Sequence, residues 1–327
     1  MLNFISESTK FYIAAPANYA TGGPELLHQL AYKMKANGKN VAMFYYPVNH
    51  PSPVHENYQE YEINFVREIE DNEDNVFIVP ETQTQLLENY IKTKKGVWWL
   101  SVDNYYLSMP GIKGKVNRFL LKKLGSQNYL FFNKKLKKVD FHLAQSEYAY
   151  ELLRLIGITN TYFLTDYLHQ SFLNVNTDLS KKQNIVAYNP KKGIKFTKKL
   201  IQYAPDIVFV PIENMTREQV VQLLQIAKVY IDFGFHPGKD RIPREAACLR
   251  CCVITNLKGA AAYFKDIPIP SDFKFDETIN NLSKISAKIH DCFTLYDQNL
   301  SKFDDYRFHI ANQEKYFESE VLDVFGE

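Results

Sequence analysis

The sequence predicts an α/β protein with two domains, each built on a doubly wound, Rossmann-like parallel sheet. Short apolar runs alternate with segments of helical periodicity along most of the 327 residues. A chain of this length also exceeds the roughly 250–300 residues at which a single hydrophobic core usually stops growing. The strand–helix pattern restarts near residue 183, after a polar stretch. We therefore expect a first domain over residues 1–170 and a second over 183–300.

Composition and charge narrow the function classes. The apolar fraction of 46% suits a globular chain, and a net charge of +2 argues against a general nucleic-acid binder. Three of the four cysteines cluster as Cys248, Cys251 and Cys252, without a second Cys or His pair nearby. We interpret them as packed thiols rather than as a zinc or disulfide site.

The first domain is expected to open with a strand–loop–helix–strand unit. The loop carries Gly22 and Gly23, but not the spacing of a dinucleotide-binding fingerprint, so no such cofactor is expected. Two glycines before a helix either let the backbone approach a ligand or form a simple tight turn. The predicted elements are strands at 11–15, 41–46, 76–79, 97–102 and 141–144, and helices at 26–34, 84–92 and 146–155.

Polar residues follow the strand predicted at 97–102. Parallel sheets bind ligands just past the carboxyl ends of their strands. Asp103 is therefore a candidate general base or acceptor contact, with Asn104 beside it. A helix cap or Asx turn explains the same residues equally well.

The segment 113–138 combines basic and apolar side chains. It contains nine Lys and Arg residues, and no acidic residue occurs between 104 and 139. This pattern predicts a surface that meets an anionic membrane. A helical pair with a solvated face and a nucleic-acid surface are the alternatives.

The second half repeats the strand–helix pattern. Thr216 and Gln219 have the spacing of a capping box. Residues 301–327 are predicted to be a terminal helix; it could pack back on the first domain, which the sequence alone does not fix. The other predicted elements are strands at 184–188, 207–210, 229–233 and 253–255, a helix ending at 203 and a helix from 243.

The turn after the strand at 229–233 is the strongest candidate site. It contains His236, Gly238 and Lys239, and the helix that follows begins with Arg241 and Arg244. Cations sit unfavourably at the positive end of a helix, so their clustering there indicates an anion such as a phosphate. The alternative is a solvated turn whose charges pair with one another. Lys191 and Lys192, which follow the strand at 184–188, could reach the same anion; the alternative is that they are exposed lysines at the entry to a helix.

The order of several motifs resembles glycosyltransferases of GT-B architecture, which have two such domains with a cleft between them. The stretch 21–41, with its Gly-Gly-Pro-Glu loop, is similar to the first βαβ unit of bacterial members. The stretch 232–255 resembles their late helix–strand unit, and a subgroup of polysaccharide-synthesis transferases in particular. The resemblance implies that Glu245 binds the donor ribose. Two departures stand out: Pro237 replaces the first of two family glutamates, and Arg250 replaces a helix-ending glycine.

From the resemblance we expect a hexosyltransferase-like enzyme that moves a sugar from a nucleotide-sugar to a glycan or lipid-linked acceptor in cell-surface polysaccharide synthesis. Arg241 would stabilise the departing phosphate, and Glu25 or Asp103 would act as base. A non-catalytic scaffold that binds a glycan or nucleotide is the alternative. The donor-binding set is expected to be His236, Gly238, Lys239, Arg244, Glu245, Lys191 and Lys192, and the acceptor loop Gly22, Gly23 and Asn104.

No cofactor and no nucleic-acid partner is expected. No divalent metal is expected either, because cations of the chain itself would replace the metal. The first ten residues do not form a signal peptide, and no apolar run approaches the ~18 residues of a spanning helix. We therefore expect a cytoplasmic protein, either free or peripheral on the inner face of the plasma membrane.

Overall fold

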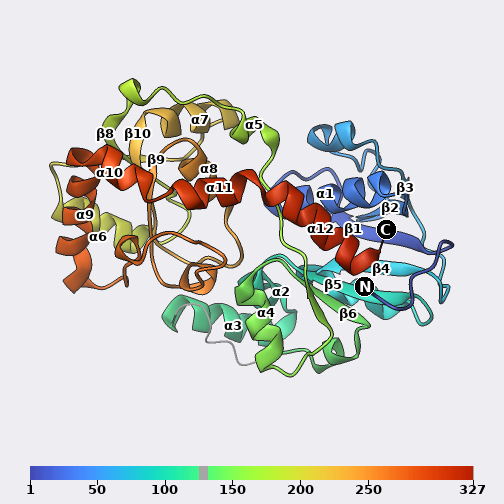
Figure 1. Ribbon diagram of the computed structural model, residues 1–327. Coiled ribbons are helices and arrows are strands. Elements are labelled where there is room, and N and C mark those ends of the chain that lie inside the picture. The colour runs from blue at the N-terminus through green and yellow to red at the C-terminus, as the bar shows by residue number, and fades with distance from the viewer. Residues whose placement is uncertain (125–131, 327) are drawn as a thin grey trace. The chain divides into compact units, whose positions relative to one another are not determined.

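The computed structural model describes residues 1–124 and 132–326 (Figure 1). The chain divides into two compact units. The first comprises Met1–Tyr167 together with Glu314–Glu327, and the second comprises Leu168–Gln313. The first boundary therefore falls between residues 167 and 168, whereas the sequence predicted it within 170–183. The second falls between residues 313 and 314, whereas it was predicted at 301. Both units have the α/β architecture expected from the sequence.

The first unit contains a seven-stranded sheet in the order β3-β2-β1-β4-β5-β6-β7, with every neighbouring pair parallel. Five strands lie where the apolar runs predicted them. The edge strands β3 and β7 were not predicted, because they are short and only partly buried or exposed. The bounds are β1 Lys10–Pro16, β2 Asn40–Tyr46, β3 Phe65–Val66, β4 Val76–Pro80, β5 Lys94–Trp99, β6 Phe141–Ala144 and β7 Thr161–Phe163.

Two predicted elements of this unit differ from the structure. The helix expected at 84–92 is a 3₁₀ segment, η2, and the strand expected to run to 102 ends at Trp99. Ser101 ends the strand because its hydroxyl accepts the N–H of Asn104 and starts a helix instead. The helical segments are α1 Gly22–Ala36, η1 Glu56–Tyr61, η2 Glu81–Asn89, α2 Val102–Ser108, α3 Gly111–Leu124, η3 Lys134–Lys138, α4 Glu147–Leu155 and α12 Gln313–Phe325.

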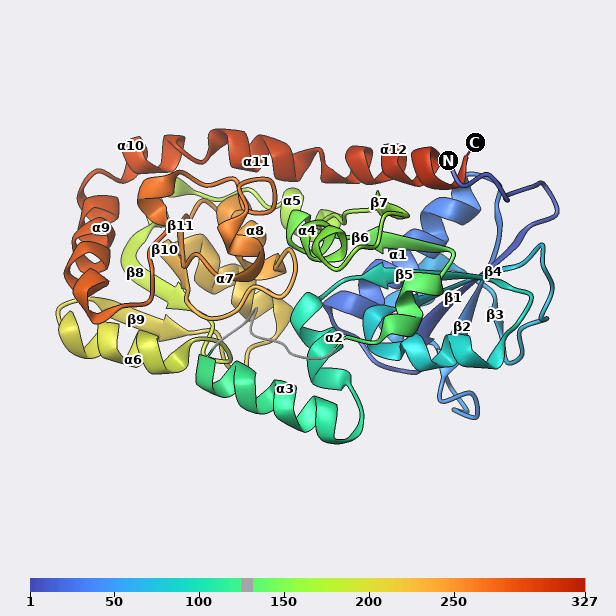
Figure 2. The same cartoon turned by 90° about the horizontal axis from the view of Figure 1, so that it is seen from below.

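The last helix, α12, completes the core of the first unit. Its buried Phe317 and Val321 lie in the same apolar cluster as Phe11 and Trp98. The N–H of Leu2 also bonds to a carbonyl of α12, so the two termini lie side by side in both views of the chain (Figures 1 and 2). Burial of these side chains holds the chain's end on the first unit.

The second unit contains a parallel four-stranded sheet in the order β11-β10-β8-β9. The capping box that opens α7 is present, since Thr216 and Gln219 exchange both expected hydrogen bonds. The strands are β8 Gln183–Tyr188, β9 Val208–Pro211, β10 Ala227–Asp232 and β11 Cys252–Thr255. The helical segments are α5 Gln170–Leu173, η4 Leu179–Lys181, α6 Ile194–Tyr203, α7 Arg217–Ile226, α8 Arg241–Cys248, η5 Gly259–Ala262, η6 Ser271–Phe273, η7 Ile279–Asn281, α9 Leu282–Thr294, α10 Tyr296–Ser301 and α11 Asp304–Ala311.

Two smaller expectations concern the cysteines and the membrane. Cys251 and Cys252 are buried free thiols, as their packing role predicts. Across the described residues, we find no helix with both the length and the apolar character needed to span a bilayer.

Candidate anion-binding site

The candidate site is built from turns at one edge of the second sheet. β10 lies between β8 and β11, and all three strands run parallel, so the turns that follow them emerge side by side. These turns are residues 189–193 after β8, 233–240 after β10 and 256–258 after β11. This carboxyl edge is where such sheets bind ligands.

The first two turns touch through their backbones. Gly193 has a φ of +53°, and a Cβ at this position would lie 1.4 Å from the carbonyl oxygen of Phe233. Only glycine allows this approach. From the other side, the side-chain amide of Asn256 donates a hydrogen bond to the carbonyl oxygen of Gly234. The turn after β10 is thus held between its two neighbours.

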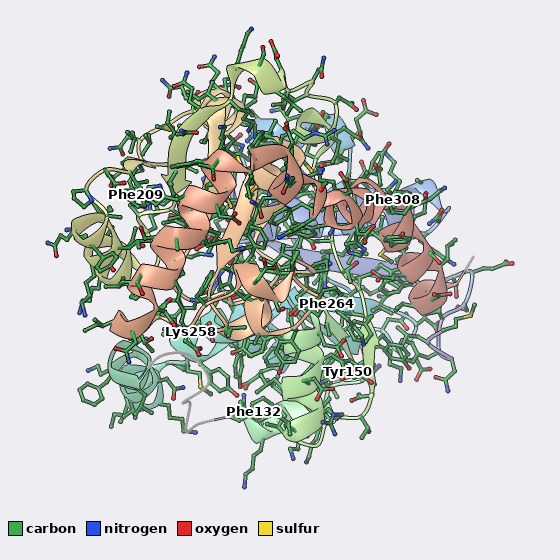
Figure 3. The ribbon with its side chains drawn as sticks, turned by 60° about the vertical axis from the view of Figure 1, so that its left-hand side comes forward. Phe132, Tyr150, Phe209, Lys258, Phe264 and Phe308 are labelled. Carbon is green, nitrogen blue, oxygen red and sulfur yellow. The ribbon has the colours of Figure 1, made fainter. Side chains whose placement is uncertain are left out.

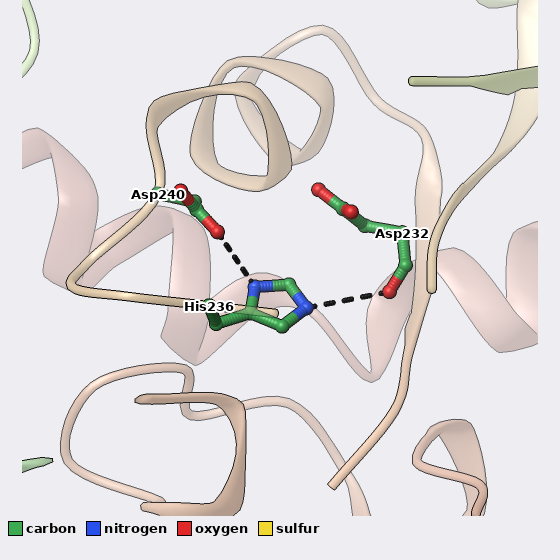
Figure 4. A group of neighbouring side chains, drawn as sticks. All are labelled: Asp232, His236 and Asp240. Carbon is green, nitrogen blue, oxygen red and sulfur yellow. Dashed lines mark hydrogen bonds and ion pairs between the residues drawn. The ribbon is translucent and has the colours of Figure 1, made fainter. Parts of the chain in front are cut away.

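Side chains add a polar network to this contact (Figure 4). Lys192 Nζ lies 2.6 Å from Asp240 Oδ2. His236 Nδ1 lies 2.8 Å from the same oxygen, as Figure 4 shows. The other ring nitrogen, Nε2, lies 3.3 Å from the carbonyl oxygen of Asp232. Burial acts to raise the pKa of Asp240, but the Lys192 charge and the His236 hydrogen bond lower it to about 2. His236 has no exposed surface, so in this structure it positions the turn rather than facing solvent.

Asp232 lies beneath the same turn. Its Oδ2 accepts a hydrogen bond from the hydroxyl of Tyr230, 2.9 Å away, while its Oδ1 is buried without a hydrogen-bond partner among the described residues. Asp232, His236 and Asp240 could offer ligand atoms within 4.8 Å of one another to a cation. The Lys192 ammonium already supplies a positive charge at Asp240, which is the group a divalent ion would need to displace.

Arg244 is buried beneath the start of α8. Its guanidinium donates to the carbonyl oxygens of Lys239 and Asp240, at 3.1 and 3.2 Å, and to Gln313 Oε1 at 2.9 Å. With only 1% of its surface exposed, Arg244 braces the turn from within. Arg244 was predicted to bind the sugar donor; its burial favours a role in positioning the turn instead.

Arg241 lies nearer the surface of the same helix. Its side chain is 20% exposed, and its Nε lies 3.5 Å from Glu245 Oε1. This pair matches the alternative in which the charges of the turn compensate one another. Gly238 and Lys239 precede Arg241 in the turn and are both buried.

His309 on α11 reports the electrostatic character of the site. Burial lowers the pKa of its imidazole, and the positive charges of Lys239 and Arg244 lower it further. The unprotonated form is favoured where the surrounding potential is positive. An anion would be attracted to the same place. Lys191 is exposed in the neighbouring turn, where its N–H bonds to Asn189 Oδ1.

The acceptor-loop candidates lie in the first unit. Gly22 and Gly23 begin α1, and Glu25 lies in its first turn with 7% of its surface exposed. Leu100, just past β5, is the neighbour nearest to the Cβ position of Gly23, at 3.7 Å. The loop thus lies at the carboxyl edge of the first sheet, as predicted.

Asp103 lies in the first turn of α2 and is 1% exposed. Its Oδ1 accepts a hydrogen bond from the hydroxyl of Tyr148 on α4, at 3.2 Å. This contact joins two helices and supports the structural explanation of Asp103 over its predicted role as a base. Its neighbour Asn104 is exposed and remains available to a ligand.

Comparison with solved structures identifies the architecture. HepE of Anabaena, solved in complex with UDP-glucose, matches with a TM-score of 0.61 and 10% identity over 96% of this chain and 98% of its own. Sucrose-phosphate synthase of Thermosynechococcus elongatus matches with a TM-score of 0.60 and 11% identity over 96% and 97%. The chain has the GT-B fold.

A third GT-B structure, TarM, matches with a TM-score of 0.56 and 10% identity over 79% of this chain. The match spans only 56% of TarM, so this chain corresponds to little more than half of that protein. No protein-family model matches the sequence, and no curated protein is recognisably similar to it. At identities this low the likeness establishes the GT-B fold, and the activity has to be argued from the site.

Three contributors to the site were not among the sequence candidates: Asp232, Asn256 and His309. Asp232 and Asn256 each end or follow a parallel strand, a position that could have singled them out. His309 lies about 70 residues beyond the turn, on a helix whose placement no local pattern encodes.

Proposed function

We propose that this chain is a glycosyltransferase that binds a nucleotide-sugar at the second unit and transfers its sugar to a glycan or lipid-linked acceptor. A UDP-hexose is the first donor to test, because HepE, which shares the fold, was solved with UDP-glucose. The observation that carries the proposal is the positive turn at the start of α8, at the edge of the sheet where this fold class binds ligands.

The chemistry follows from where charge develops. When the glycosidic bond to the phosphate breaks, the electron pair stays on the phosphate oxygen, and negative charge grows there. Fixed positive groups aimed at that oxygen lower the barrier. Arg241 and Lys239, together with the N–H groups that open α8, are the groups proposed for this role. Glu245 is proposed to accept hydrogen bonds from the ribose hydroxyls.

Metal independence is part of the proposal. Lys192 supplies a cation at Asp240, and Lys239 and Arg241 bring two more to the same turn. Such side chains can neutralise a diphosphate without a divalent ion. Turnover is therefore expected to survive EDTA. Loss of activity in EDTA with recovery in Mn²⁺ or Mg²⁺ would instead assign a metal to Asp232, His236 and Asp240.

The proposal extends to the acceptor and the cellular setting. Glu25 is the remaining base candidate beside Gly22 and Gly23, since Asp103 is tied to Tyr148. We propose a role in cell-surface polysaccharide synthesis from the motif order of residues 232–255. We also propose peripheral contact with an anionic membrane through the segment 113–138, although residues 125–131 of that segment lie outside the described part of the chain.

The test is a screen of the intact protein with UDP-, GDP- and CMP-sugars. The assay measures release of the free nucleotide with and without glycan acceptors. Release from one donor, lost in Arg241→Ala, supports the transferase. If a thermal shift shows nucleotide binding but no nucleotide is released and no sugar reaches any acceptor, the scaffold is favoured. The reason to consider a scaffold is Pro237, which stands where the resembled family often has its first glutamate.

A further inference from the structure

The first unit contains a pocket that is lined largely by the segment 113–138, for which a membrane contact is proposed above. It has a volume of about 810 Å³ and opens broadly to solvent. Its lining comes from the start of α3, the segment around η3 and the residue that follows α4. We call it the lysine pocket, and its principal lining residues are Lys113, Lys134, Lys135, Lys137, Phe132 and Ile156.

The lining of the lysine pocket carries a strong excess of positive charge. Among the lining residues that the structure describes, four are lysines and none carries a carboxylate. Lys135 forms an ion pair with Glu88 at 3.0 Å, in which both side chains are largely exposed. Exposed pairs of this kind contribute little and are easily exchanged. The pocket is therefore suited to an anionic group, and to a phosphate in particular.

Large apolar side chains are exposed next to the lysines. Ile112 precedes Lys113 and is 78% exposed, and Leu155 precedes Ile156 and is 74% exposed. Phe119, about two turns further along α3, is 56% exposed. Phe132, labelled in Figure 3, adds an aromatic ring to the pocket itself. Exposed side chains of this size beside basic residues are typical of surfaces that enter the headgroup region of a bilayer.

We propose that the lysine pocket binds the phosphate headgroups of an anionic phospholipid bilayer, while Ile112 and Leu155 insert into the interface. The positive charge of the pocket complements the anionic headgroups. The exposed aliphatic side chains of Ile112 and Leu155 favour a bilayer over nucleic acid, because proteins bind single-stranded nucleic acid through basic and aromatic side chains. The proposal deepens the membrane contact proposed above. It does not depend on sugar transfer, because vesicle binding is measured without any nucleotide-sugar.

The test is co-sedimentation of the full chain with vesicles. One set contains phosphatidylcholine alone, and the other contains roughly one-third phosphatidylglycerol. The pocket variant combines Lys113→Gln, Lys134→Gln and Lys137→Gln, and it leaves the pair of Lys135 intact. The matched control removes the same charge from α6 of the second unit, with Lys195→Gln, Lys198→Gln and Lys199→Gln. All six lysines are exposed, so both variants should fold, and their melting temperatures check this.

The wild-type chain and the control should bind the anionic vesicles but not the neutral ones. The pocket variant should lose about 100-fold in partitioning, since each lysine near such a surface contributes about one factor of five. Replacing Ile112 and Leu155 by serine should weaken binding at high salt, where the charge contribution is screened. Absence of wild-type binding, or equal loss in both lysine variants, overturns the proposal. The proposal is also overturned if the wild-type chain binds an oligonucleotide more tightly than the anionic vesicles and the pocket variant loses that oligonucleotide binding.

Discussion

Lys192 Nζ lies 2.6 Å from Asp240 Oδ2, and this contact joins the turn after β8 to the residue that precedes α8. The contact keeps Asp240 ionised, since the Lys192 charge helps to hold the pKa of that carboxyl at about 2 despite its burial. An ionised Asp240 in turn orients His236. The turn that carries Lys239 and Arg241 is thus held from its neighbours before any ligand arrives, which is what a preorganised anion site requires.

Gly193→Ala should disrupt this arrangement. The new methyl group would collide with the Phe233 carbonyl oxygen, and the positive φ adds strain. We expect a loss of about 2–4 kcal/mol in unfolding free energy and weaker nucleotide binding. Gly38→Ala is the matched control, because its φ is +75° with no atom within 4 Å of the Cβ position. It should cost only about 1–2 kcal/mol, from φ alone. Equal effects of the two substitutions on denaturant unfolding would contradict the proposed backbone contact.

Arg241→Ala and Arg244→Ala should separate catalysis from stability. Arg241 is partly exposed and lies 3.5 Å from Glu245, so its loss should leave the melting temperature almost unchanged and cut turnover by about 10²–10³. Arg244 is buried among oxygen acceptors, so Arg244→Ala should lower the unfolding free energy by roughly 2–4 kcal/mol. Paired turnover and unfolding measurements decide the matter. Normal turnover in a folded Arg241→Ala protein would remove Arg241 from the mechanism.

Arg250→Gly should stabilise the protein. Arg250 follows α8 with a φ of +64°, a conformation that costs a non-glycine residue about 1 kcal/mol. The bond from Tyr296 to the backbone carbonyl of Arg250 should survive the change. The melting temperature should rise by roughly 2 °C. Arg154→Gly, inside α4, should instead lower it. A lower melting temperature for Arg250→Gly would show that its side chain contributes more than the strain costs.

Glu81→Gln should flatten the pH dependence of stability. Glu81 ends up buried after β4, where it accepts the N–H of Leu100, and burial raises the pKa of its carboxyl to about 8. A carboxyl whose folded pKa is raised contributes stability that is complete below its unfolded pKa and is lost as the pH rises through the folded value. Wild-type stability should therefore fall between about pH 5 and 8, by up to about 1.4 kcal/mol per pH unit.

Thermal unfolding across that range measures the effect of Glu81. The Gln variant keeps the acceptor but cannot ionise, so its melting temperature should stay level where that of the wild type falls. Glu88→Gln is the control, since Glu88 is exposed and forms only a surface pair with Lys135. A Glu81→Gln profile parallel to that of the wild type would mean that Glu81 does not titrate in this range.

The sequence predicted the architecture well because buried parallel strands are continuous apolar runs, as at 76–79 and 141–144. It missed β3 and β7, which are short and incompletely buried edge strands. An anion site was inferred from Lys239 and Arg241, because cations at the start of a helix break a local rule, and that site stays a prediction. The distinction between Arg241 and the buried Arg244 could not be predicted, since it depends on Gln313, 69 residues away. The contact of Asp103 could not be predicted for the same reason, because its partner Tyr148 lies on another helix.

Titration of the protein with UDP by isothermal calorimetry tests the central claim most directly. The wild-type chain should bind, and combined Lys239→Ala and Arg241→Ala substitutions should weaken binding at least about 10-fold, because both cations are proposed to bind the phosphates. Lys195→Ala with Lys198→Ala removes the same charge from exposed positions on α6 and should leave the affinity unchanged. The account would be contradicted if the wild-type chain bound none of UDP, GDP and CMP. It would also be contradicted if the wild type and the variant with both Lys239 and Arg241 replaced had equal affinities for UDP.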